Sequence, residues 1–335
     1  MTTRIPYEII FIRAVTFWLA IVFSVPVPAQ LKRLNVGYSG IGGGQLPAWV
    51  AKETGIFRKN DLDVQLVYFR GGTTAVMALL SRETPIASAA GPGIISAALR
   101  GADAVMIAGG VVASETWFVS RPEIKSGDQL KGGSVAIASF GGAAEFHTRS
   151  SLKKFGLIPL KDVAIVQVGS SAERLAALET GKVQAAMLSP PDSYVAQKKG
   201  FHVLMDFEIP YQSVGVATTR RFIRENPDIV SRYVRSHIIA IHLMKTDRET
   251  GLKILTKYLG LRDKEIMERT YDHVTTDDVL PPKQYPTLEG IKAILEPLAE
   301  KDSKAKAAKP EDFVEMSFVK DLDQSGYVDS LYKRK

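Results

Sequence analysis

The sequence predicts an α/β protein with two similarly built halves, each a mainly parallel sheet covered by helices, followed by a largely helical segment. Short apolar segments of strand type alternate with helical segments from residue 34 to about 205. Connections of only a few residues between them favour parallel sheets. A glycine-rich loop follows the first strand of each half, at Ser39–Gly44 and at Ser139–Gly142.

The first half opens with a strand at Leu34–Tyr38 and a helix at Leu46–Thr54, with Pro47 in its first turn and Gly55 just past its end. Alternating β-branched and aromatic residues predict the next strand at Leu62–Phe69. The remaining elements of this half are strands at Pro85–Ala90 and Ala104–Ala108 and helices at Ala75–Glu83 and Ile94–Arg100.

The second half repeats the pattern from a strand at Ser134–Ala138 and a helix at Ala143–Phe155. Ser170–Glu173 has the spacing of a capping box that opens a further helix. Further strands of this half are expected at Ala164–Val168, Gln184–Leu188 and His202–Met205, with a short helix ending at Gly200, and one more strand follows the half at Val214–Thr218. Beyond these we expect a long amphipathic helix at Pro227–Lys245, shorter helices, a polar spacer at Ala299–Asp312 and a docked segment at Phe313–Tyr332.

The composition is that of a globular protein of about two domains. The chain has 335 residues, of which 45% are hydrophobic and 24% charged, so disorder, collagen and coiled coil are excluded as its main structure. It has no cysteine. The absence of cysteine excludes disulfides, thiolate metal sites, cysteine nucleophiles and a lipoprotein anchor.

The N-terminus is typical of a cleaved secretory signal peptide. Arg4 and Arg13 precede Ala14–Val25, a twelve-residue uncharged run, and Val27-Pro28-Ala29 places small residues at the cleavage positions. A membrane span needs ~20 apolar residues. We therefore expect residues 1–29 to be removed after Ala29 and the protein to be periplasmic; an uncut membrane anchor is the alternative. Without that segment the formal charge changes from +7 to +6.

Several kinds of chemistry are disfavoured by motif and spacing. Neither glycine-rich loop is followed by the Lys-Ser/Thr of a P-loop, and neither has dinucleotide spacing. The five histidines lack metal-ligand spacing, and there is no G-x-S-x-G turn. Basic residues are interleaved with acidic ones, which disfavours a nucleic-acid groove despite the positive charge. We expect no metal, cofactor or nucleic acid.

Two loops at the carboxyl ends of strands are candidate binding elements. Gly71–Thr74 and Ser139–Ala143 each offer backbone N–H groups and hydroxyls at a helix start. Ligands of open α/β sheets lie at this edge, and helix N-termini favour carboxylate, sulfonate or phosphate groups. Each loop alone is equally well a tight turn with an ordinary Ser or Thr cap.

The order of several segments resembles the substrate-binding proteins of nitrate/sulfonate/taurine-type ABC importers. The resemblance rests on Leu46–Phe69, on Gly71–Thr74 followed by Pro85–Gly91, on Asp128–Ala136, on Gly181–Ala186 and on Arg220–Ile229. Gln184 stands where that family usually has Asp. The similarity extends over about residues 33–330, and it is the order and spacing of the pieces that make it specific.

The resemblance implies a two-lobed fold of the type II periplasmic-binding-protein kind. One lobe would comprise 31–117 and 216–335, the other 121–211, with hinges near 117–122 and 212–215. The ligand would lie between the lobes, against Ser39, Ile41, Gln45, Gly72, Thr73, Thr74, Ala90, Gly91, Ser139, Phe140, Gly141, Gly142, Pro191 and Asp192. The family often has an aromatic residue beside Pro190–Asp192, and this chain lacks it. For Asp192 a cap on a helix beginning at Ser193 is favoured over pairing with a ligand amine.

The function implied is capture of a small molecule and its delivery to an ABC permease in the inner membrane, by a monomeric protein that is not an enzyme. The positive charge and the two helix starts favour an anionic ligand, and its class stays open among sulfonates, carboxylates and pyrimidines. Two alternatives remain. One is a ligand-sensing module without transport, and the other a thiamine-pyrimidine-synthase-like enzyme, which the missing cysteines disfavour.

Overall fold

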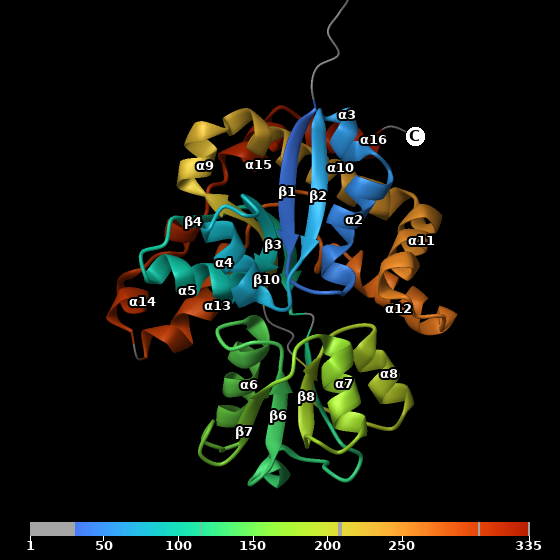
Figure 1. Cartoon of the computed structure of the whole chain (residues 1–335), viewed down its shortest axis with the longest axis vertical. Helices are drawn as coiled ribbons and strands as arrows, with labels where there is room; N and C mark the ends of the chain where they lie inside the picture. Colours follow the sequence, from blue (N-terminus) through green and yellow to red (C-terminus); the bar gives the residue numbers. More distant parts are fainter. Residues whose placement is uncertain (1–30, 115, 207–209, 301, 334–335) are drawn as a thin grey trace, which may run out of the picture. The chain divides into compact units, whose positions relative to one another are not determined.

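Two five-stranded sheets flanked by helices form the framework of the protein (Figure 1). The computed structural model describes residues 31–114, 116–206, 210–300 and 302–333. The strand order is β2-β1-β3-β10-β4 in the first sheet and β7-β6-β8-β5-β9 in the second. The expected signal peptide, residues 1–29, lies outside the described residues. Within the described ranges, no helix combines the length and apolar character that crossing a membrane requires.

The elements have the following bounds. The first sheet consists of β1 (Lys32–Tyr38), β2 (Leu62–Tyr68), β3 (Ile86–Ala90), β4 (Ala104–Ala113) and β10 (Pro210–Thr219). The second consists of β5 (Trp117–Ser120), β6 (Ser134–Ile137), β7 (Ala164–Gln167), β8 (Ala185–Leu188) and β9 (His202–Met205). The helices between strands are the 3₁₀ turns η1 (Gly43–Gln45) and η2 (Gly127–Leu130) and the α-helices α2 (Leu46–Glu53), α3 (Ile56–Lys59), α4 (Gly72–Leu80), α5 (Gly91–Leu99), α6 (Ala143–Lys154), α7 (Ser171–Glu179) and α8 (Asp192–Lys198). After β10 come α9 (Arg220–Glu225), α10 (Pro227–Thr246), α11 (Arg248–Leu259), α12 (Lys264–Val274), α13 (Leu288–Ala299), α14 (Ser303–Ala307), η3 (Pro310–Phe313), α15 (Ser317–Gln324) and α16 (Tyr327–Lys333).

Both sheets are mainly parallel, and each contains one antiparallel strand. Strand β1 pairs in parallel with β2 and β3, and β6 does so with β7 and β8. Strand β10 runs antiparallel between β3 and β4, and β5 antiparallel between β8 and β9. The predicted α/β class with two helix-flanked sheets is therefore confirmed.

The inner strands of each sheet are buried on both faces, which explains why β3, β5 and β8 read as nearly continuous apolar runs. In β5, Phe118 packs into one core while its neighbours Trp117 and Val119 pack into the other, because successive side chains point to opposite faces. The first sheet likewise has two cores. One contains Trp49 of α2 and Tyr233 of α10, and the other contains residues of α5 and α13.

The C-terminal part covers the first sheet, and one expectation about it needs correction. The predicted docking of the last segment is confirmed, since Val319 and Val328 are buried in the core with Trp49. The prediction of a polar spacer at 299–312 is wrong, because this segment contains the helix α14 and most of the 3₁₀ turn η3. Asp302 accepts a hydrogen bond from the N–H of Lys304 at 2.9 Å, and Ala305 is buried, so a cap and one apolar anchor suffice to form the short helix.

The two segments expected as hinges lie in or beside strands. Trp117 pairs with Leu188, so Trp117–Ser120 is part of the second sheet, and 212–215 lies within β10. Where the chain bends when ligand binds stays a prediction.

Candidate functional site

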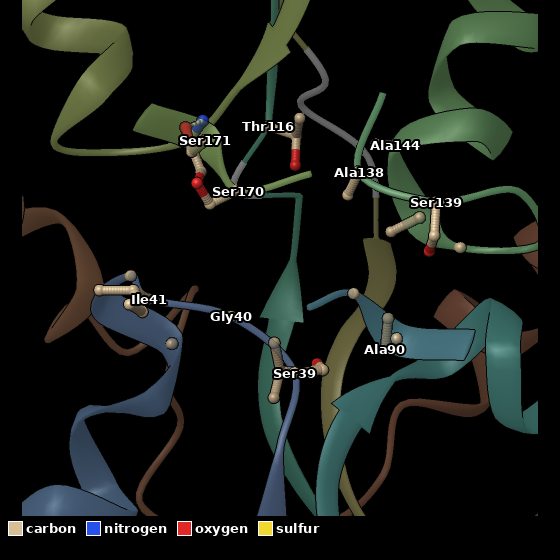
Figure 2. A pocket seen from close by; sticks show the side chains of 18 of the residues that line it. Ser39, Gly40, Ile41, Ala90, Thr116, Ala138, Ser139, Ala144, Ser170 and Ser171 are labelled. Atoms are coloured by element: carbon tan, nitrogen blue, oxygen red, sulfur yellow. Dashed lines mark hydrogen bonds between the residues drawn. The ribbon is translucent and has the colours of Figure 1, made fainter. Parts of the chain in front are cut away.

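A cavity of about 150 Å³ lies at the ends of the strands, with walls from both sheets' loops. The loops after β1, β2 and β3 form one wall, and those after β6, β7 and β8 form the other. Figure 2 shows Ser39, Ile41 and Ala90 on one wall and Ser139, Ser170 and Ser171 on the facing wall. Thr116 lies on that facing wall, between Ser139 and the two other serines. These are the carboxyl ends of parallel strands, where open α/β sheets bind ligands.

The structure brings half of the predicted residues to this cavity. They are Ser39, Ile41, Gln45, Gly72, Ala90, Ser139 and Gly142. The predicted residues that do not line it are Thr73, Thr74, Gly91, Phe140, Gly141, Pro191 and Asp192.

Most of the residues outside the cavity are engaged elsewhere. Thr73 donates its hydroxyl to the carbonyl oxygen of Phe140 at 2.7 Å, which joins the β2–α4 loop to the β6–α6 loop. The N–H of Gly141 donates to Glu145 at 2.5 Å within the second half. Gly91 lies against β10 so closely that a Cβ there would be 2.3 Å from the carbonyl oxygen of Gln212. These residues shape or close the site without facing its interior.

The favoured role of Asp192 as a helix cap is wrong. Helix α8 begins at Asp192 itself, after Pro191, and has no side-chain cap. Burial raises the pKa of Asp192, while a hydrogen bond with Ser171 and the charge of Arg174 oppose that rise. Asp192 therefore interacts with two residues that line the cavity, although it does not line the cavity itself.

The most informative residue of the cavity, Arg174, is one that the sequence analysis did not single out. It lies in α7, whose first turn is held by a capping box between Ser170 and Glu173. Its side chain lines the cavity, although the residue is only 5% exposed. Its Nε donates to the carbonyl oxygen of Met187 at 2.6 Å, and Nη1 donates to the carbonyl oxygen of Gly169.

Arg174 is a buried cation without an ion pair among the described residues. Burial lowers the pKa of Arg174 to about 10, so the guanidinium stays charged at neutral pH. Asp192 and Glu173 act on it only through space. A buried charge is costly unless it is paired, so the position is suited to an anion that enters the cavity.

Tyr68 faces the same cavity from the end of β2. Burial raises the pKa of Tyr68, whereas the charges of Arg70 and Arg174 act in the opposite direction. The phenol is therefore neutral and offers an O–H donor near the guanidinium. Further hydroxyls in the wall are those of Thr116, Ser170, Ser171, Ser189 and Ser213.

Side-chain contacts join the helices of the second sheet to the β2–α4 loop and to the C-terminal helices. Arg70 forms an ion pair with Glu173. Lys153 pairs with Glu300 at 2.6 Å, and Lys198 with Asp263 at 2.8 Å. The guanidinium of Arg269 lies 3.9 Å from the ring centre of Tyr194. In the described structure the two walls of the cavity are therefore in contact with each other.

The family model for the NMT1-like family matches residues 28–256. The chain belongs to the NMT1-like family. A relative named as a binding protein, YtlA of Bacillus subtilis (strain 168), is 26% identical over 200 residues, which cover 57% of this chain and 59% of that protein. The matched stretch thus spans less than two thirds of the relative.

The NMT1-like chain shares its fold with solved binding proteins. The periplasmic aliphatic sulphonate binding protein SsuA of Escherichia coli superposes with a TM-score of 0.65 at 20% identity, over 85% of this chain and 92% of that one. The periplasmic nitrate-binding protein NrtA of Synechocystis PCC 6803 gives a TM-score of 0.69 at 14% identity, over 91% and 92%. The predicted resemblance to nitrate- and sulfonate-type binding proteins and the periplasmic-binding-protein fold are confirmed.

Metal binding has no support in the part of the chain that the structure describes. No group of three or more His, Asp or Glu side chains there is arranged to hold an ion. In this NMT1-like protein, the polar groups of the cavity are instead hydroxyls, one carboxamide, one guanidinium and backbone amides.

Proposed function

We propose that the protein is a periplasmic solute-binding protein that captures a small organic anion between its two lobes and delivers it to an ABC permease. The observation that carries the proposal is Arg174, a charged and 5% exposed guanidinium that lines the cavity and has no ion pair among the described residues. A small anion in the cavity would complete its coordination.

The surroundings of Arg174 favour an anion over a cation. Tyr68 lines the same cavity from the other wall and interacts electrostatically with Arg174, and the cavity includes Gly72 and Ala143, the first residues of helices α4 and α6. Helix N-termini carry about half a positive charge and favour negative groups. All of these elements act in the same direction on a ligand.

Binding would close the protein because the anion contacts both walls. A ligand shifts a conformational equilibrium only by its different affinity for the two states. In the proposed closed state the ligand touches Arg174 of one lobe and Tyr68 of the other, whereas in an open state it keeps only one of them. Closure would present the loaded protein to the permease and would need no chemical step.

The proposal includes export to the periplasm, with residues 1–29 removed after Ala29, and a role as a monomer. It also includes the absence of catalysis. A chain without cysteine lacks the segment on which the related thiamine-pyrimidine synthases rely. The N-terminal sequence of the purified mature protein tests the cleavage position.

The decisive experiment compares the wild-type protein with Arg174→Gln. We expect small carboxylates or sulfonates to bind the wild type in isothermal titration, and the variant to lose at least ~10-fold in affinity, as for a buried hydrogen-bonded charge. Arg174→Lys, which keeps the charge but not the fork of donors, should lie between them. Thermal unfolding of both variants shows whether they fold. If folded Arg174→Gln binds these anions as tightly as the wild type does, the anion site is not at Arg174.

Mass spectrometry of the small molecules released on denaturing the purified protein identifies the natural ligand. We expect an organic anion. A cationic or uncharged compound released in equal molar amount would overturn the proposal.

A further inference from the structure

Two buried polar atoms in the cavity wall have no hydrogen-bond partner among the residues that the structure describes. They are Oε1 of Gln45, in a residue that is 4% exposed, and Oγ of Ser139, in a residue that is 6% exposed. Gln45 ends the 3₁₀ turn after β1, and Ser139 follows β6, so they belong to different walls. Buried polar groups are nearly always hydrogen-bonded, and an unsatisfied one is costly.

On two sides of the Ser139 hydroxyl the neighbouring residue is a glycine, which has no side chain that could form a hydrogen bond with it. A Cβ built on Gly71 would lie 2.7 Å from its Oγ, and one built on Gly142 would lie 3.2 Å from it. Both neighbours are glycines, so the hydroxyl is enclosed by backbone. A serine hydroxyl is redirected by rotation about a single bond, which allows it to reach a molecule in the cavity.

We propose that the ligand is a hydroxylated small organic anion, with its anionic group on Arg174 and its hydroxyl between Gln45 and Ser139. This inference rests on the binding role proposed above and names the ligand class of the same site. A hydroxyl both donates and accepts. It can donate to the amide oxygen of Gln45 while it accepts from the hydroxyl of Ser139, so one group satisfies both walls.

The choice of a hydroxyl rather than an ammonium group follows from charge. Among the described residues that line the cavity there is a guanidinium and no carboxylate, so an ammonium group would be repelled by Arg174 and would find no carboxylate in the wall to bind. The size of the ligand follows from the cavity, about 150 Å³. An engineered protein cavity of ~150 Å³ holds benzene, so an anion of roughly six or seven non-hydrogen atoms fits.

The test measures what a ligand hydroxyl contributes to affinity. Isothermal titration compares propionate with 3-hydroxypropionate, and ethanesulfonate with 2-hydroxyethanesulfonate. In the wild type we expect the hydroxyl to tighten binding about 10-fold in the pair whose head group fits, because a buried donor or acceptor left unpaired costs about that much. The two pairs distinguish a carboxylate from a sulfonate head.

The same titrations are repeated on Gln45→Leu and Ser139→Ala. In each variant we expect the preference for the hydroxylated anion over its unsubstituted counterpart to fall to about three-fold or less. Ser193→Ala is the matched control. Its Oγ is also buried and unpartnered, but Ser193 does not line the cavity. That variant should keep the wild-type preference.

The outcomes separate the two proposals. If the wild type binds an unsubstituted anion as tightly as its hydroxylated counterpart, or if both folded variants retain the full preference, the hydroxyl assignment is overturned while the anion site stands. If none of the four anions binds the wild type, and the molecule that co-purifies is not an anion, the proposed function itself fails. Should Ser139→Ala not fold, Gln45→Leu alone decides the assignment.

Discussion

Arg70, just after β2, forms an ion pair with Glu173 in the first turn of α7, and this pair links the two walls of the cavity next to Arg174. The same Glu173 carboxylate accepts a hydrogen bond from the N–H of Ser170 at 2.8 Å, as part of the capping box. Hydrogen bonds from the backbone N–H and from the hydroxyl of Ser170 are the main cause of the lowered pKa of Glu173, and the charge of Arg70 lowers this pKa further. Glu173 thus fixes the start of α7 and also one contact between the two walls of the cavity.

Replacing Arg70 should weaken ligand binding modestly. The Arg70 and Glu173 side chains are 66% and 37% exposed, and exposed ion pairs contribute ~0.2–1 kcal/mol. We expect Arg70→Gln to lower affinity for the tightest-binding anion of the panel about two- to five-fold, mainly through faster dissociation. Arg232→Gln is the control, because it removes a comparably exposed pair, with Asp61, beside the first sheet only. Equal dissociation rates for Arg70→Gln and wild type would contradict the role in closure.

A side chain at position 71 should obstruct closure. Gly71 has a φ of +93°, and a Cβ there would lie 2.7 Å from Oγ and 3.1 Å from Cβ of Ser139 on the facing wall, so rotation of the hydroxyl alone does not make room. We expect Gly71→Ala to lower affinity at least ~10-fold, since the walls must move apart to accept the methyl group. Gly101→Ala imposes the same backbone strain at φ +92° but meets nothing within 4 Å. The control should lose stability comparably and keep its affinity. Comparable affinity losses in both variants would show that strain, not closure, is responsible.

Two glycines within helices should respond to alanine in opposite directions. A Cβ at Gly251 of α11 would lie 2.2 Å from the hydroxyl of Tyr271, which is buried between helices. We expect Gly251→Ala to lower the free energy of unfolding by ~1–3 kcal/mol through overpacking. At Gly93 of α5 the nearest atom would be 3.5 Å away, an ordinary contact. Gly93→Ala should therefore leave stability unchanged or raise it by ~0.5–1 kcal/mol, as helix propensity predicts. Urea unfolding of both variants measures the difference, and a stable Gly251→Ala would show that Tyr271 moves aside.

Stability should fall as the pH drops below about 6.5. Burial lowers the pKa of His237 from 6.5 to about 4, opposed by its hydrogen bond to Gln284. Between those values the unfolded chain binds a proton that the folded protein does not, so the free energy of unfolding rises with pH across this window. His147, whose burial lowers its pKa to about 3, acts in the same direction.

Urea unfolding between pH 7.5 and pH 4.5 measures this dependence. We expect His237→Leu to have a shallower slope than wild type in that range, because one of the imidazoles whose pKa is lowered by burial is gone. The absolute stability of the variant at pH 7.5 is a separate quantity and does not enter the comparison. Parallel curves for the two proteins would show that His237 does not contribute.

The sheets and half of the cavity residues were predictable because they depend on local patterns. Apolar strands with short connections indicate parallel sheets, and parallel strands place their carboxyl ends at one edge, where Ser39, Gly72, Ala90 and Ser139 line the cavity. Arg174 was not predicted as a binding residue, because the sequence does not show that its guanidinium is buried in the cavity wall. The available indication was its place in α7, three residues after Ser171 and four before Leu178, both buried.

The remaining errors have related physical causes. Phe140 and Gly141 lie in the predicted loop, but the loop turns so that a backbone carbonyl meets Thr73 and the Phe140 ring is 43% exposed. Asp192 was interpreted from its neighbours in sequence, whereas its environment is set by Ser171 and Arg174. In each case the direction of a side chain depends on a partner distant in the chain.

The placement of β10 between β3 and β4 determines when each half can be finished during synthesis. All strands of the second sheet have been made once the ribosome has passed residue 205. The first sheet at that point still lacks β10, the strand that lies between β3 and β4. Only after Thr219 is translated can that gap be filled. The half that begins the polypeptide is therefore the last to be completed, and a fragment ending before β10 would leave β3 and β4 without the neighbour that joins them.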